Sequence, residues 1–188
     1  LVAPMIGLLL GYLLLKIITL LVYKRSPASI NKWSRRGQLI SAALYSLGHG
    51  GNDAQKTMGI ITSLLFSAGI ISTFEVPFWV AISSNAVIAL GTLFGGWRIV
   101  KTMGQKITKL RPIDGVCAET SSAISLFVAG HFGAPVSTTH VITSSITGVG
   151  AAKRISAVRW GVMAQILWAW LLTIPLSGLL AAGVYFII

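Results

Sequence analysis

Acidic residues are scarce in this sequence: only four of its 188 residues are Asp or Glu, whereas fifteen are Lys or Arg. It has a single cysteine, Cys117, which excludes an internal disulfide and a cysteine-based metal cage. Long stretches carry no charge, hydrophobic residues make up 54% of the chain, and the mean hydropathy is +0.81. This composition argues against a soluble domain. It predicts an all-α, polytopic transmembrane helical bundle, placed in the lipid bilayer of a cell membrane as a multi-pass protein.

The positive charge is concentrated in a few places. The net charge is +11, and thirteen of the fifteen Lys and Arg lie in residues 24–36, 98–111 and 153–159, between apolar runs. Short basic loops beside membrane spans mark the cytoplasmic side, so all three are predicted to lie there. The basic residues do not alternate with aromatic side chains that could stack on bases. We therefore expect no nucleic-acid partner.

Three apolar stretches predict membrane spans, at residues 1–23, 78–97 and 160–188. The first is too long for a signal peptide and has no basic flank before it. Because the chain begins inside this apolar run and without Met, we expect it to be a piece of a longer protein. Two glycine pairs permit close helix packing, and we assign them no functional role: Gly7 with Gly11, and Gly91 with Gly95.

Residues 38–74 are too long for one straight span. At about 1.5 Å per residue they would cover about 55 Å, against a hydrocarbon core of about 30 Å. Three glycines within residues 48–53 lower helix propensity there, and Asn or Asp can begin a new helix. We therefore expect a break at 48–53, with a short helix over 39–47 and a longer one over 54–74.

Residues 114–152 begin and end on the predicted cytoplasmic side. They form either two short passes or a re-entrant hairpin, with a turn at residues 133–135. Hydroxyl-rich segments on both sides of that turn favour partial entry, because non-helical backbone at membrane depth needs protein or water around it. The expected fold thus includes broken or re-entrant helices.

Two of the four carboxylates, Asp53 and Glu119, lie inside otherwise apolar stretches. An acid within the membrane is costly, so each is a candidate functional residue. The alternative is structural: each could cap a helix or pair with a base such as Lys56. Asp114 and Glu75 lie at the edges of predicted spans, where we expect a solvated cap and a loop residue.

Two polar segments have the chemistry of an ion site. At 49–57, a helix that begins after the glycines would offer free N–H groups to an anion, while Asn52 and Asp53 hold a small cation or, at Asp53, a proton. At 133–140, Pro135 interrupts the chain, Ser137 can cap the next helix, and a hydroxyl cluster can bind an oxyanion. The alternative is that these hydroxyls bond back to their own helical turn.

The two segments together, Gly48-His49-Gly50-Gly51-Asn52-Asp53-Ala54-Gln55-Lys56 and Pro135-Val136-Ser137-Thr138-Thr139-His140, resemble the C-terminal repeat of the PiT family of inorganic phosphate transporters. The resemblance runs over nearly the whole chain, 1–188, and implies one half of an inverted-repeat transporter whose N-terminal repeat is absent here. It implies phosphate symport with H⁺ or Na⁺ and no bound cofactor or resident metal. The implied coupling-ion residues are Asn52, Asp53 and Glu119, and His49, Lys56 and His140 support them. The implied phosphate-binding residues are Gln55, Ser121, Ser122, Ser137, Thr138 and Thr139.

One departure bears on the coupling ion. The Gln55-Lys56 pair resembles bacterial low-affinity members, which implies H⁺ coupling, a metal phosphate as cargo and a bacterial plasma membrane. A homodimer is a further expectation. The alternatives are a sulfate permease on the same scaffold and a structural membrane subunit. An enzyme is not expected: a hydrolase with His49, Asp53 and His140 as metal ligands lacks an H-E-x-x-H helix.

Overall fold

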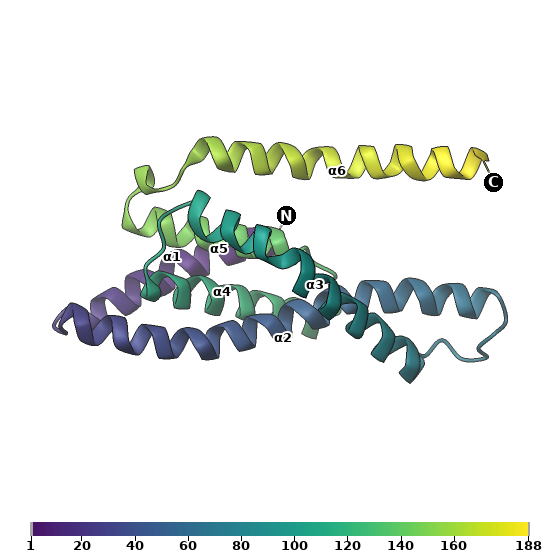
Figure 1. The fold of residues 1–188 in the computed structure, drawn as a ribbon, viewed down its shortest axis with the longest axis horizontal. Coiled ribbons are helices and arrows are strands. Elements are labelled where there is room, and N and C mark those ends of the chain that lie inside the picture. Colours follow the sequence, from purple (N-terminus) through teal and green to yellow (C-terminus); the bar gives the residue numbers. More distant parts are fainter. Residues whose placement is uncertain (1, 188) are drawn as a thin grey trace.

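The computed structural model describes residues 2–187, and every regular element in that range is a helix (Figure 1). The predicted all-α fold is therefore confirmed. The elements in chain order are α1 (Val2–Val22), α2 (Pro27–Ser67), α3 (Phe78–Lys106), α4 (Pro112–His131), α5 (Thr138–Lys153), the short 3-10 helix η1 (Ile155–Ala157) and α6 (Trp160–Ile187).

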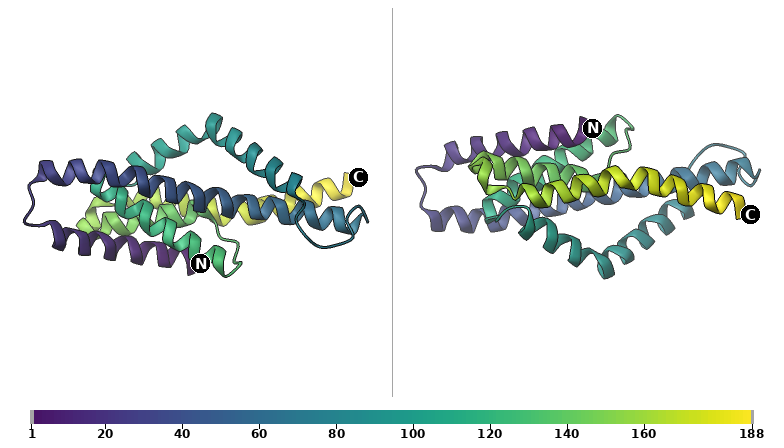
Figure 2. Two further views of the ribbon diagram at one scale, coloured as in Figure 1. Left: turned by 90° about the horizontal axis from the view of Figure 1, so that it is seen from below. Right: turned by 90° about the horizontal axis from the view of Figure 1, so that it is seen from above.

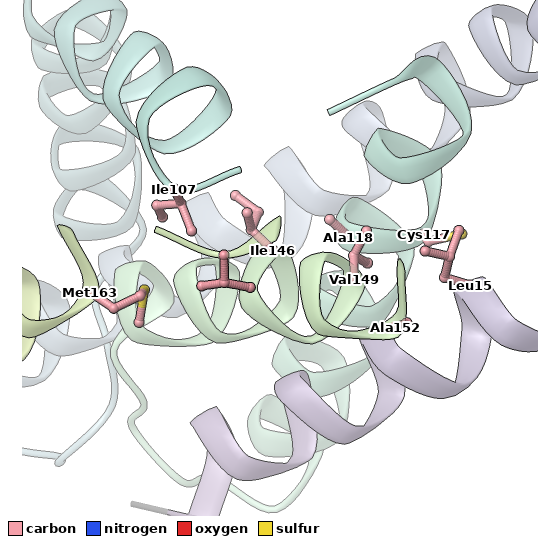
Figure 3. Packing of buried hydrophobic residues seen from close by; sticks show 9 residues of the cluster. Leu15, Ile107, Cys117, Ala118, Ile146, Val149, Ala152 and Met163 are labelled. Carbon is pink, nitrogen blue, oxygen red and sulfur yellow. The ribbon is translucent and has the colours of Figure 1, made fainter. Parts of the chain in front are cut away.

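Helix α5 packs against both α1 and α4, and α2 runs along α4 (Figures 1 and 2). The buried apolar core lies where α1, α4 and α5 meet (Figure 3). Leu15 of α1, Cys117 of α4 and Val149 of α5 belong to it, and Met163 joins it from α6. The single thiol is thus a buried packing group, as free cysteines often are.

Helices α3 and α6 lie on the outside and expose most of their large apolar side chains, including Phe94, Leu171 and Ile174. Three helices are long and apolar enough to cross a membrane, over Val2–Val22, Phe78–Trp97 and Trp160–Phe186. They match the three predicted spans within the described residues. Such extensive apolar surface is suited to lipid or to further helices rather than to water.

The predicted break in residues 48–53 is wrong, because α2 is one continuous helix of 41 residues. The short helix expected over 39–47 and the separate one over 54–74 do not exist. A helical glycine costs only about 1 kcal/mol relative to alanine, which packing against another helix can offset. Gly48 is buried against α4, and a Cβ there would lie 3.3 Å from Cβ of Leu126. This glycine therefore lets α2 approach α4 closely instead of ending the helix.

A helix of this length covers about 60 Å, which is twice the hydrocarbon thickness. Its first turns carry Lys32, Arg35 and Arg36, all exposed. Because charged side chains are disfavoured in hydrocarbon, these turns belong to the membrane surface or beyond it. The long segment is accommodated by a helix that leaves the membrane rather than by one that breaks within it.

Residues 114–152 form a helical hairpin of α4 and α5, with the turn where it was predicted. Gly133 has φ +63°, a left-handed conformation that a residue with a side chain rarely adopts. Ser137 caps α5, because its hydroxyl oxygen accepts a hydrogen bond from the His140 N–H at 3.4 Å. With 16 residues, α5 is about 24 Å long, shorter than the hydrocarbon core. This length favours partial entry over a full pass.

Asp114, in the first turn of α4, does cap the start of the helix through its side chain, but the expectation that it is solvated is wrong. Its side chain is fully buried, and it accepts hydrogen bonds from the Arg111 backbone N–H at 2.7 Å and from the Arg111 guanidinium at 3.3 Å. Lys153, at the end of α5, lies 2.5 Å from the carboxylate oxygen that accepts from the Arg111 backbone N–H. The hairpin brings the end of α5 to the start of α4, so this carboxylate joins both helices.

One of the two glycine pairs forms a close helix contact. A Cβ on Gly11 of α1 would lie 2.5 Å from the Ser145 carbonyl oxygen of α5, and one on Gly7 would lie 2.9 Å from Oγ of Ser145. Gly91 and Gly95 of α3 have no neighbouring atom within 4 Å of such a Cβ among the described residues. The first pair therefore sets the distance between α1 and α5, and the second does not.

Replacing Gly11 by alanine is expected to destabilise the protein by about 1–3 kcal/mol, because the new methyl group overpacks the α1–α5 contact. The melting temperature of the full-length protein in detergent measures this. Gly91→Ala is the matched control, and it should leave the melting temperature unchanged or raise it, since alanine favours a helix. Equal effects of the two substitutions would contradict the close contact.

Candidate functional site

Polar side chains recur every three or four residues along the middle of α2. This spacing places them on one face of the helix, which is turned toward α4 and the α4–α5 turn. We call this set the polar stripe of α2; its members are Gln38, Ser41, Tyr45, His49, Asn52, Asp53 and Lys56.

Asn52 is the most buried side chain in the half of the stripe nearer the α4–α5 turn, with 4% of its surface exposed. Its Nδ2 donates to the Leu126 carbonyl of α4 at 3.3 Å, and its Oδ1 accepts from the Val136 N–H at 3.5 Å. Leu126 lies before the α4–α5 turn and Val136 lies after it. One amide therefore ties α2 to both sides of the turn.

Asp53 lies at the centre of a partly exposed cluster. One carboxylate oxygen lies 3.0 Å from Nε2 of His49, and the other lies 3.0 Å from Nζ of Lys56. The Thr138 hydroxyl, in the first turn of α5, donates to the same carboxylate at 3.3 Å. Sequence analysis placed Asn52, Asp53 and Thr138 in one site, and the structure brings these three together.

Lys56 does more than neutralise Asp53. Its ammonium also donates to the Val136 carbonyl at 2.7 Å, just before the N-terminus of α5. The Asp53 carboxylate and the Val136 carbonyl thus both accept hydrogen bonds from the Lys56 ammonium. These are the oxygen types that would otherwise coordinate a small hard cation.

His49 connects Asp53 to Tyr45. Its Nδ1 lies 3.3 Å from the Tyr45 hydroxyl, while its Nε2 faces Asp53. With the proton on Nε2, the ring donates to Asp53 and accepts from Tyr45, so both ring nitrogens are used.

Glu119 belongs to a separate cluster. The Ser41 hydroxyl donates to one of its oxygens at 2.5 Å, and Nε2 of Gln38 donates to the other at 3.4 Å. Ser41 precedes Asp53 by three helical turns, about 18 Å along α2. The two intramembrane acids therefore contact opposite ends of the polar stripe and do not form one ion site.

Several predicted phosphate ligands make only local contacts here. The buried Ser121 and Ser122 hydroxyls both donate to the Ala118 carbonyl of their own helix, at 3.0 and 2.7 Å. Ser137 serves as the α5 cap, and Thr139 beside it is partly buried. In this conformation the α4 serines bond back to their own helical turn.

His140 lies apart from the other predicted supporting residues. Its ring stacks on Trp170 of α6, with ring centroids 3.8 Å apart. Among residues 2–187, no group of three His, Cys, Asp or Glu side chains is placed to hold a metal ion. His140 therefore tethers α6 to the hairpin, while His49 and Asp53 lie in the α2 cluster.

A hollow of about 530 Å³ opens beside the Asp53 cluster. Two of the predicted site residues line it, namely Gln55, which is exposed, and Lys56, which is partly buried. Gly133 and Pro135 of the α4–α5 turn also line it. Ser63 adds a hydroxyl from the next turns of α2. The hollow is large enough for a hydrated oxyanion next to a lysine.

Sequence analysis missed Gln38, Ser41 and Tyr45. Their signal was the period of three to four residues that they share with His49 and Asn52, and that period also indicates an unbroken helix. The glycines at 48–51 favour a break, but in the structure the helical period continues through them.

Three helices long and apolar enough to span a membrane, together with a partly buried cluster of acid, base and hydroxyl groups, define this molecule as a polytopic membrane protein with a candidate ion site. The model of the phosphate transporter family matches residues 1–181, and the chain belongs to that family. It is thus a multi-pass plasma-membrane protein of a transporter family, not an enzyme.

Relatives support this assignment and the resemblance to bacterial low-affinity members. The chain is 58% identical over 185 residues to a probable low-affinity inorganic phosphate transporter of Rhizobium meliloti (98% of this chain, 55% of the relative). It is 46% identical over 187 residues to one of Bacillus subtilis (99% and 56%). A solved structure entitled "The sodium-dependent phosphate transporter" is similar with TM-score 0.76 and 32% identity (85% and 41%). The chain spans about half the length of the curated relatives it matches.

Asn52→Ala is expected to destabilise the full-length protein by about 1–3 kcal/mol, because both bonds to the α4–α5 turn are lost. The melting temperature in detergent measures the effect. Asn85→Ala is the control, since Asn85 is exposed and its amide donates to Ala81 within α3. If Asn52→Ala costs no more than Asn85→Ala, Asn52 does not hold the turn.

Proposed function

We propose that this chain is the C-terminal repeat of a secondary active transporter that carries inorganic phosphate across the plasma membrane in symport with H⁺. An N-terminal repeat of opposite orientation supplies the other half of the path. Membership of the phosphate transporter family supports the substrate, and the share of each relative that the chain covers supports the division into halves. A homodimer and a metal phosphate as cargo remain predictions.

The observation that carries the proposal is the position of Lys56. Its ammonium lies between Asp53 and the turn before α5, and it lines the hollow that also exposes Gln55. A phosphate in this hollow would find the Lys56 ammonium, the Gln55 amide and the Ser63 hydroxyl. Lysine ammonium groups bind phosphate in other proteins.

The same residue supports H⁺ as the coupling ion. A bound Na⁺ would need the oxygens of Asp53 and Val136, which Lys56 already contacts at 3.0 and 2.7 Å. A proton needs no such coordination, since it can be taken up by His49 or Asp53, whose side chains lie 3.0 Å apart. Loading the site with phosphate would draw Lys56 away from Asp53 and leave the carboxylate to bind the proton.

Alternating access would follow from movement of one repeat against the other around the α2 cluster. The α4–α5 hairpin is the element that such a movement would displace, because it contacts the stripe through Asn52, Asp53 and Lys56. The Glu119 cluster lies nearer the start of α2, at Gln38 and Ser41, and would keep that part of α2 attached to α4.

Labelled phosphate uptake into liposomes tests the coupling. The full-length protein should accumulate phosphate under an inward proton gradient, with choline in place of Na⁺, and excess sulfate should not compete. Asp53→Asn should abolish gradient-driven uptake, because the carboxylate no longer ionises. Glu75→Gln, in the connection before α3, is the control and should transport normally. Uptake that requires Na⁺ and ignores the proton gradient would contradict H⁺ coupling.

Lys56→Ala tests the phosphate contact. Loss of a charged hydrogen bond of about 1.5–3 kcal/mol should raise the KM for phosphate by about ten- to a hundredfold. Lys32→Ala, on the exposed first turns of α2, is the matched control and should leave KM unchanged. A Lys56→Ala protein with the KM of the unaltered one would exclude Lys56 as a phosphate ligand.

A further inference from the structure

A second hollow, of about 880 Å³, lies away from the polar stripe, where α1, the end of α5 and the α3–α4 connection meet. Its described lining contains no carboxylate. Hydroxyls of Thr19, Thr108 and Ser156 line it as well. Six basic side chains surround it: Lys16, Lys109, Arg111, Lys153, Arg154 and Arg159.

The chain itself neutralises only part of this charge. Asp114 pairs with Arg111 at 3.3 Å and with Lys153 at 2.5 Å. The sequence has only three other carboxylates. Asp53 and Glu119 are engaged along the polar stripe, and Glu75 lies in the connection between α2 and α3. Four cations around one hollow are therefore left without an acidic partner among the described residues, and their repulsion favours a bound anion.

The position of the hollow indicates which anion. Lys16 and the exposed Leu20 belong to α1, a candidate membrane span, whereas Arg154 and Arg159 lie in a loop predicted to be cytoplasmic. The hollow therefore reaches from the aqueous surface to the boundary of the acyl chains. Lysine near the end of a span extends its ammonium toward the headgroups, and basic hollows between helices at this level suit acidic headgroups.

We propose that this hollow binds the phosphate headgroup of an acidic phospholipid, with the first acyl carbons along Leu20. Inorganic phosphate shares the headgroup chemistry but gains nothing from the apolar side of α1. The lipid site is distinct from the transport site, because no residue lines both hollows. It would hold α1, α5 and the α3–α4 connection together at the membrane surface.

Native mass spectrometry of the full-length protein in detergent tests the proposal, with phosphatidylglycerol as the probe and phosphatidylcholine as the neutral lipid. The double variant R154Q/R159Q should bind phosphatidylglycerol about tenfold more weakly than the unaltered protein, since two of the basic groups around the headgroup are removed. The control R35Q/R36Q removes the same charge from the exposed start of α2 and should change the affinity less than about twofold. Melting temperatures establish that both variants are folded.

A single-residue variant and two competition results also test the lipid site. Lys16→Gln should weaken phosphatidylglycerol binding on its own, because Lys16 enters the hollow from the membrane span. Equal weakening by R35Q/R36Q would mean general surface attraction and overturn the site. Displacement of the lipid by millimolar inorganic phosphate would show a free-anion site and overturn the lipid assignment. Equal affinity for phosphatidylcholine would overturn both.

Discussion

The attachment of α2 to the α4–α5 turn through Asn52 is the interaction on which the rest of the structure depends. A polar group in the membrane must find its hydrogen-bond partners within the protein. The Asn52 amide donates to the Leu126 carbonyl and accepts from the Val136 N–H, on either side of the turn. This fixes the start of α5 against α2. Asp53, the next residue, then reaches Thr138, and Lys56, one turn along, reaches Val136, so the ion-pair cluster exists because Asn52 places the hairpin.

Much of the fold could be predicted because its signals are local. Apolar runs predict spans within α1, α3 and α6, and Gly133 with the Ser137 cap predicts the α4–α5 turn. The predicted break of α2 failed because glycine was read as a helix terminator, although Gly48 is a contact surface for α4. A tertiary contact made between segments far apart in sequence has no local signal.

The candidate site also has residues that the sequence identifies locally and contacts that only the tertiary structure determines. Asn52, Asp53 and Lys56 were identified from their type and their apolar surroundings, and the structure assembles them with Thr138. Glu119 stays a prediction as a site residue, and its partner Ser41 lies three turns from Asp53, a separation that only the pairing of α2 with α4 determines. The burial of Asp114 also required the hairpin, since Lys153 reaches it from the far end of α5.

The central claim is that phosphate binds beside Lys56, at the hollow between α2 and the α4–α5 turn. An electron cryomicroscopy map of the full-length protein in lipid nanodiscs, with and without saturating phosphate, tests it most directly. The account predicts tetrahedral density within hydrogen-bond distance of the Lys56 ammonium, with that ammonium moved off Asp53. Phosphate density elsewhere, with Lys56 still between Asp53 and the Val136 carbonyl, would contradict it.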